Sequence, residues 1–222
     1  MSVDGGLNYS GHGTGYAGPL LIPNVRMSRV SGELFVSIEP PAIGASVDAS
    51  GKVSVVWADC RSGPDDDGGA CKKNSLFTSN TLDGRHRSPI VPLPTGDRST
   101  SADHFLPAIG IDPSTAGTSA HIGVLYYFYP VADCSADTCD LSVGLISSTD
   151  GGATWDRQQL AGPFRNTWLP PGEFGHRPGD YFDVTFVNGH AVAVFTAASE
   201  GGCALGEISC HTWIASATLP VA

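Results

Sequence analysis

Four side chains that can take part in catalysis fall within nine residues of one another. They are Glu173, Arg177, Asp180 and Tyr181. Carboxylates transfer protons, an arginine fork grips a substrate carboxylate, and a tyrosine hydroxyl serves as a nucleophile. The same residues also suit a polar linker ending in a strand whose tyrosine packs against its neighbour. We prefer this plainer interpretation, because the chain has only five glutamates and no motif gives any of them a role.

Three further groups of residues could take part in binding or catalysis. Asp103-His104 stands at the start of a predicted strand and can bind a sugar hydroxyl or donate a proton, although such a pair more often caps a linker. Arg61 is a candidate for gripping an anionic group. Three consecutive aspartates at 65–67 offer oxygen ligands for Ca²⁺. They lack the ligand order of an EF-hand, so we expect a solvated loop and no bound metal or cofactor.

Six cysteines form three close pairs, and each pair encloses a loop of small and polar residues. Disulfides between neighbours, acting as clips across hairpins, are the preferred pairing. Zinc is the alternative, but no Cys-x-x-Cys occurs and only His211 stands beside a cysteine. Disulfides favour a secreted or surface-exposed protein. The first residues do not resemble a signal peptide, so we expect a removed signal or an incomplete sequence. The predicted disulfides are Cys60–Cys71, Cys134–Cys139 and Cys203–Cys210.

The cysteine pairs mark an internal repeat of about seventy residues, because their first members are 74 and 69 residues apart. Apolar, strand-like runs precede and follow each pair, and no segment shows a helical period. A small all-β unit that recurs is typical of propeller blades. The sequence therefore predicts a single partial β-propeller over residues 1–222. Its expected parts are 1–32 (the end of one blade and a linker), 33–98, 103–163 and 178–219, or roughly three and a half blades.

The turn at 148–155 carries the most specific motif. Its five fixed residues are Ser148, Asp150, Gly152, Thr154 and Trp155. They resemble the Asp box, Ser-x-Asp-x-Gly-x-Thr-Trp, of sialidase-like (BNR-repeat) β-propellers. The carboxylate can accept backbone N–H groups, the glycines permit unusual backbone angles, and the tryptophan can pack between strands. A degenerate copy stands at 2–9. We therefore expect a structural role for these residues.

The resemblance implies the C-terminal portion of a six-bladed ring. Missing N-terminal blades or a dimer partner would complete it. It also implies a glycan or polysaccharide ligand and, as one activity, exo-alpha-sialidase or other glycoside hydrolysis. A non-catalytic extracellular propeller that binds carbohydrate or protein remains the alternative. The family's Arg-Ile-Pro strand is absent, so no catalytic residue is assigned by resemblance. Sites in the family lie on the face away from the Asp boxes, where we expect Glu39, Asp59, Arg61, Asp103, His104, Tyr129, Asp133, Glu173, Arg177, Asp180 and Tyr181.

Composition excludes several other classes of function. The formal net charge is -10, with no cluster of Lys or Arg that follows a phosphate backbone, so nucleic acid is not an expected partner. The longest apolar run is far shorter than the roughly 20 residues that a membrane helix needs. The 28 glycines and 16 prolines are spread between apolar runs, which favours short strands and turns over disorder.

Overall fold

The computed structural model describes residues 42–60, 73–96, 102–132, 134–135, 137–172, 175–179, 181–201 and 211–220. Within these ranges the helical residues are confined to two single-turn 3₁₀ helices, η1 (Gly117–Ser119) and η2 (Asn166–Trp168). Antiparallel strands make up the rest of the regular structure. The predicted all-β fold is therefore confirmed.

Three antiparallel meanders follow one another along the chain. The first contains β1 (Ile43–Val47), β2 (Val53–Asp59), β3 (Ser75–Thr81) and β4 (Val91–Pro92). The second contains β5 (Asp103–Ile111), β6 (Ile122–Tyr129), β7 (Asp140–Ser148) and β8 (Asp156–Arg165). The third contains β11 (Asp183–Val187), β12 (His190–Ala198) and β13 (Thr212–Pro220). A short hairpin of β9 (Pro171–Gly172) and β10 (Gly175–His176) lies in the segment between the second and third sheets.

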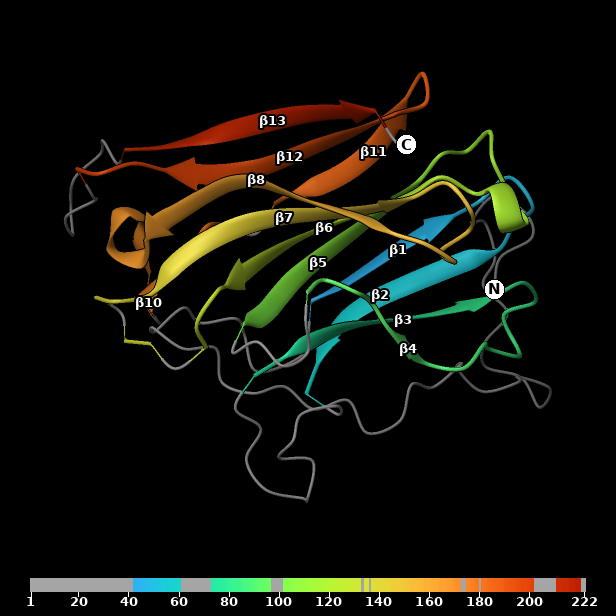
Figure 1. Cartoon of the computed structure of the whole chain (residues 1–222), viewed down its shortest axis with the longest axis horizontal. Coiled ribbons are helices and arrows are strands. Elements are labelled where there is room, and N and C mark those ends of the chain that lie inside the picture. Colours follow the sequence, from blue (N-terminus) through green and yellow to red (C-terminus); the bar gives the residue numbers. More distant parts are fainter. Residues whose placement is uncertain are drawn as a thin grey trace, which may run out of the picture.

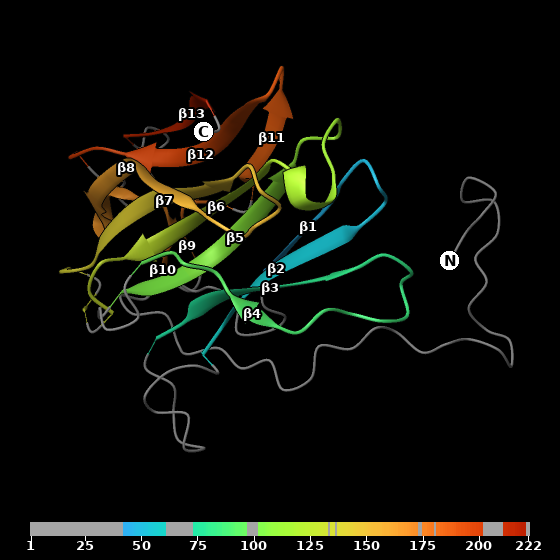
Figure 2. The ribbon, with the colours of Figure 1, turned by 45° about the vertical axis from the view of Figure 1, so that its right-hand side comes forward.

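The three sheets stack side by side as successive blades of a partial propeller (Figures 1 and 2). The first strand of each sheet is the inner one, since β1 packs against β5 and β5 packs against β11. Three sheets fall short of the four to eight blades that close a ring. The blades differ from one another in their outermost strands. In the first sheet this strand, β4, has only two residues, whereas β8 in the second sheet has ten.

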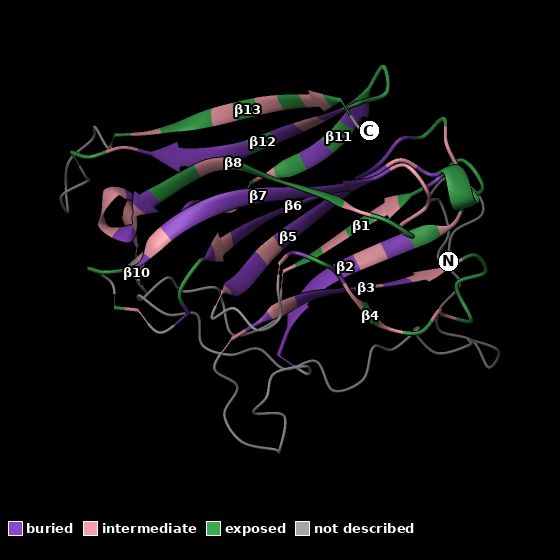
Figure 3. Ribbon diagram, viewed as in Figure 1, coloured by how far each residue is buried: buried purple, intermediate pink, exposed green. Residues whose placement is uncertain are grey.

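Strands β5, β6 and β7 of the middle sheet are buried on both faces, which explains their long apolar sequences (Figure 3). Along β6, Val124 and Tyr126 lie in a core shared with the first sheet. Leu125 and Tyr127, which point the opposite way, lie in a core shared with the third sheet. A strand covered on both faces has no polar side to show in an alternating pattern. The continuous apolar run at 122–129 is the result.

Two glycines allow the inner strands to approach one another. A Cβ atom at Gly44 of β1 would lie 3.0 Å from the backbone nitrogen of Ile109 in β5. A Cβ atom at Gly110 of β5 would collide with the carbonyl oxygen of Val184 in β11. Backbone meets backbone at both places, so neither contact can relax by a change of rotamer. Glycine is needed here because the sheets are close.

We expect Gly110→Ala to destabilise the chain by about 1–3 kcal/mol, because the new methyl group must push β5 and β11 apart. Gly123→Ala on β6 is the matched control. Its Cβ would lie 3.3 Å from the side-chain Cγ2 of Val184, which can adjust. Urea unfolding measures both variants. Equal losses of unfolding free energy would contradict the close packing of the inner strands.

Hydrogen bonds close the turn between β7 and β8. Asp150 Oδ1 accepts the Thr154 N–H at 2.8 Å and the Ser148 hydroxyl at 2.8 Å, and Asp150 Oδ2 accepts the Thr154 hydroxyl at 2.6 Å. These bonds, that of the Thr154 side chain above all, lower the pKa of Asp150 to about 2. The Trp155 indole N–H donates to the Gly152 carbonyl at 2.9 Å. These side chains thus bond within the turn itself, whereas the Gly151 N–H donates to the Ala120 carbonyl at 3.1 Å.

The neighbouring turns at the same end connect the first two sheets. Asp48 Oδ2, after β1, accepts the backbone N–H of Gly117 at 3.1 Å. The N–H of Ala49 donates to the Thr115 carbonyl at 3.0 Å. We call this the β7–β8 turn end of the molecule. Its aspartates hold turns together, so the opposite end is the better place to look for a ligand site.

Candidate functional site

The opposite end, which we call the clip-loop end, is where β2, β6 and β12 finish and where β5, β7 and β13 begin (Figure 1, left). The Cys134–Cys139 disulfide lies here, in the connection from β6 to β7, with its Cα atoms 5.1 Å apart. This predicted pair is confirmed. The predicted pairs Cys60–Cys71 and Cys203–Cys210 include residues outside the described ranges.

The structure places several predicted site residues at the clip-loop end. They are Asp59, Asp103, His104, Tyr129, Arg177 and Tyr181. The others lie outside the described residues; these are Glu39, Arg61, Asp133, Glu173 and Asp180. The group at 173–181 therefore contributes Arg177 and Tyr181 to the site described below.

Asp103, the first residue of β5, is fully buried. Its Oδ1 accepts two hydrogen bonds from Asn74, one from the backbone N–H at 2.8 Å and one from the side-chain amide at 2.9 Å. Its Oδ2 is buried without a hydrogen-bond partner. Burial raises the pKa of Asp103 to about 7, against the opposing effect of the Asn74 bonds. A carboxyl group that keeps its proton near neutral pH can act as a general acid.

His104 lies on the other side of β5 and has a different environment. Its ring stacks on Phe128 at a centroid distance of 5.8 Å and lies 5.6 Å from the ring of Tyr126. Burial lowers the pKa of His104 to about 4, so the ring is neutral at physiological pH. Its backbone N–H donates to the Asn74 carbonyl at 3.1 Å. Asp103-His104 is therefore part of the core and not the linker cap that such a pair usually forms.

A bulge in β5 makes Asp103 and His104 face these sides. The register with β6 shifts between Phe105 and Ala108, and Leu106 has a φ of 48°. Before the bulge Phe105 faces the core of the third sheet, whereas after it Ile109 faces the core of the first sheet. The strand thus exchanges its faces at the bulge. Bulges of this kind are common beside functional sites.

A chain of hydrogen bonds connects the disulfide to the Asp103 region. Tyr129 stands opposite Asp103 in the β5–β6 ladder. Its hydroxyl donates to Asn166 Oδ1 at 3.0 Å, and the Asn166 N–H donates to the Cys139 carbonyl at 3.1 Å. Burial keeps the pKa of Tyr129 well above its usual value, so the phenol remains a donor. The disulfide therefore helps to position the ladder partner of Asp103.

Sequence reasoning missed Asn74 and Asn166. Each is an isolated asparagine, and its partner is 29 or 37 residues away in the sequence. No local motif marks such residues, because their importance comes from hydrogen bonds to residues far away in the sequence.

Tyr181 has an environment that the sequence interpretation did not expect. Its side chain is 90% exposed, two residues before β11 begins. The expected packing of this tyrosine against a neighbouring strand is therefore wrong. Asp183, the first residue of β11, is also exposed. An exposed aromatic ring such as that of Tyr181 is suited to stacking on a sugar ring.

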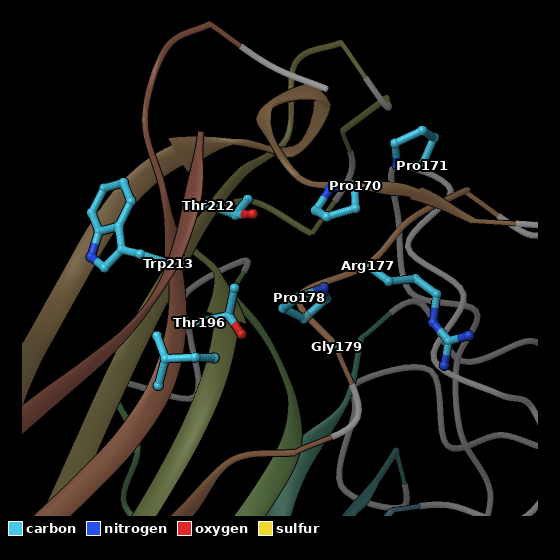
Figure 4. Close-up of a pocket in the computed structure, with 9 residues that line it drawn as sticks. Pro170, Pro171, Arg177, Pro178, Gly179, Thr196, Thr212 and Trp213 are labelled. Atoms are coloured by element: carbon cyan, nitrogen blue, oxygen red, sulfur yellow. The ribbon is translucent and has the colours of Figure 1, made fainter. Parts of the chain in front are cut away.

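A cavity of about 570 Å³ opens beside this segment. Backbone bonds from the Arg177 N–H to the Pro170 carbonyl at 3.0 Å hold the wall formed by the linker. In Figure 4 the side chains of Arg177 and Trp213 point away from each other, so proline rings and threonines line the space between them. The lining residues are Pro170, Pro171, Arg177, Pro178, Gly179, Thr196, Thr212, Trp213 and Ile214.

The described residues contain neither a cluster of metal ligands nor a membrane-spanning helix. No group of three or more His, Cys, Asp or Glu side chains there is placed to hold a metal ion. The three aspartates at 65–67, for which we expect a solvated loop, lie outside these ranges. No helix in the described part of the chain has the length and apolar character to cross a membrane.

Comparisons with known proteins find similarity in solved structures only. No family profile matches the sequence, and no curated protein matches it either. A Hadza microbial sialidase is similar at 12% identity and a TM-score of 0.44, over 70% of this chain and 32% of that one. Penicillium chrysogenum alpha-L-arabinanase complexed with arabinobiose is similar at 12% identity and a TM-score of 0.38, over 77% of this chain and 55% of that one. The chain thus spans about a third and about half of the lengths of these two proteins.

Proposed function

We propose that this chain acts on glycans at the clip-loop end and that it takes part in glycoside hydrolysis. The observation that carries the proposal is Asp103, a buried carboxyl group with one oxygen held by Asn74 and the other unpaired. A glycosidase needs such a group to protonate the oxygen of the bond that breaks. The Asp box, with its hydrogen-bonded turn, supports the assignment of the blades to a sialidase-like propeller.

In the proposed hydrolysis, each of two carboxyl groups has one role. Asp103 Oδ2 gives its proton to the glycosidic oxygen, which leaves with the departing sugar. Asp183, exposed at the start of the adjoining inner strand, fits the second role of activating water or attacking the sugar carbon. Asp103 is enclosed, so the substrate must displace the residues that cover it. Tyr181 offers a stacking surface at the same end.

A non-catalytic glycan-binding module is the second candidate. The enclosure of Asp103 favours it, because a fully buried carboxyl group does not meet a ligand without a rearrangement. Tyr181, by contrast, is ready to contact a sugar as it stands. Both candidates suit a protein of an oxidising compartment, which the Cys134–Cys139 disulfide supports. We place the protein outside the cell on this ground.

The test uses the 222-residue chain with fluorogenic sialosides, arabinosides and other glycosides, and with immobilised glycans. We expect cleavage of at least one substrate, and about tenfold weaker glycan retention in Tyr181→Ala than in the control Tyr181→Phe, because one stacked ring is worth about 1 kcal/mol or more. Retention that depends on Tyr181 without any cleavage would support the binding module instead. A chain that neither cleaves nor retains a glycan would contradict both.

A further inference from the structure

The third sheet ends in an unprotected edge strand. β13 pairs with β12 at nine consecutive positions without a register shift. Among the described residues no strand lies on its other side, whereas the third strands of the other two sheets are followed by β4 and β8. Figure 3 shows the contrast, since β7 is mostly buried and β13 alternates between intermediate and exposed residues. β13 thus lacks a neighbouring strand like β8, which covers the outer side of β7 in the second sheet.

The edges of the other sheets carry features that block strand pairing. β8 begins with Asp156 and Arg157, contains Pro163, and has two register shifts against β7. β4 is only two residues long and includes a proline. Charges, prolines, bulges and short strands are the usual protection of an exposed edge. The two outer edges are therefore closed to further strands.

β13 has none of these features in its interior. No charged residue occurs between Thr212 and Pro220, and the single proline is the last residue. Two large apolar side chains are exposed on it, Trp213 at 49% and Ile214 at 68%. An edge that is long, flat and uncharged is a template for another strand. The nine residues of this open edge therefore carry no charge that would repel an identical strand.

We propose that β13 pairs with β13 of a second copy of this chain, antiparallel across a two-fold axis. The sequence of β13 complements itself in this arrangement. With Ser216 opposite its own counterpart, Trp213 lies opposite Leu219, and Ala215 lies opposite Ala217. On the core-facing side large side chains meet large ones and small ones meet small ones. On the other face Ile214 lies opposite Thr218, and no like charges meet. Opposed residues point to the same face of the sheet, so Ala215, Ala217 and Leu219 of both copies keep their packing against the core.

Analytical ultracentrifugation over a concentration series tests the dimer. We expect the wild-type chain to dimerise, and Ser216→Lys to raise the dissociation constant at least about tenfold, because the substitution places two like charges opposite each other. Gln158→Lys on the protected edge of β8 is the matched control, since both positions are exposed. We expect it to dimerise as the wild type does. A chain that is monomeric at every concentration, or an equal effect of both substitutions, overturns the proposal.

A second variant tests which residues of the two β13 strands lie opposite each other. Ser216→Cys is expected to form a disulfide-linked dimer under mild oxidation, seen on a nonreducing gel, because the Cα atoms of directly opposed residues lie about 4.5–5.5 Å apart, within the range that a disulfide spans. Gln158→Cys is expected to stay monomeric on the same gel. Hydrogen exchange then identifies the occupant. Protection of 212–220 that grows with concentration supports a second copy, and protection that is independent of concentration overturns it in favour of a strand from the same chain.

Discussion

Replacing Asp103 by asparagine is expected to lower kcat/KM for glycoside cleavage by about 10²–10⁴, the usual contribution of a general acid. The substitution preserves the local structure, because an asparagine oxygen accepts the same two hydrogen bonds from Asn74. It removes only the transferable proton. Glycan binding should change little, since Tyr181 is untouched. The measurement is steady-state cleavage of the best fluorogenic substrate by the variant and the wild type.

Asp140→Asn is the control for this substitution. Asp140 also lies at the clip-loop end, but its Oδ1 is paired with the Arg165 Nε at 2.9 Å on the surface. We expect the control to keep activity close to that of the wild type. The wild-type rate should also fall as the pH rises through about 7, where Asp103 loses its proton. Equal rates in Asp103→Asn and the wild type would remove Asp103 from the mechanism.

The second large effect is on the free energy of unfolding, to which the titrations of Asp103 and His104 contribute in opposite directions. The pKa of Asp103 is about 7 in the folded chain, against 3.8 for an ordinary aspartate. Between these values the folded chain holds a proton that the unfolded chain has lost. The free energy of unfolding therefore falls as the pH rises through this interval, by about 4 kcal/mol at the full shift.

His104 has the opposite dependence. Its pKa is about 4 in the folded chain, against 6.5 for an ordinary histidine. Between these pH values His104 binds a proton in the unfolded chain but not in the folded chain. The free energy of unfolding therefore falls as the pH drops through this interval, by about 3 kcal/mol. From about pH 4 to 6.5 the two contributions cancel, and Asp48 and Asp150, with pKa values of about 2, titrate below this window.

Single substitutions should reveal the separate pH dependences of Asp103 and His104, which cancel each other in the wild type. Asp103→Asn is expected to make the chain more stable as the pH rises from 4.5 to 6.5, because only the His104 contribution remains. His104→Phe, which keeps an aromatic ring against Phe128, is expected to show the reverse slope. The double variant should resemble the wild type in slope. Urea unfolding at pH 4.5, 5.5 and 6.5 measures all four chains, and parallel dependences in the two single variants would refute the opposed titrations.

Local sequence was sufficient for the strands and the turns. The apolar run at 122–129 became a strand buried on both faces, and the turn at 148–155 closed through its aspartate. The close cysteines 134 and 139 formed a disulfide across a short connection. Each of these features depends on residues near one another in the chain. Their physical causes are therefore visible in a short window of sequence.

The environment of each candidate site residue was not visible in this way. Asp103 and His104 point to opposite faces of β5, as neighbours in a strand do, and the bulge at Leu106 sets which face each one takes. Nothing in that apolar stretch marks a bulge. The pKa of Asp103 depends on its burial and on Asn74, which lies 29 residues away in the sequence, immediately before β3. The exposure of Tyr181 depends on the path of a linker between sheets. Such properties arise from contacts across the fold, so the sequence identified the residues without their surroundings.

The pH titration of the Asp103 side-chain carboxyl by ¹³C NMR tests the central claim most directly. The Asp103→Asn variant assigns the resonance. We predict a midpoint near pH 7 in the free protein and a displaced midpoint when a saturating glycan is bound at the clip-loop end. A midpoint near the ordinary value of 3.8, or a titration that a bound glycan leaves unchanged, would contradict the assignment of the site to Asp103.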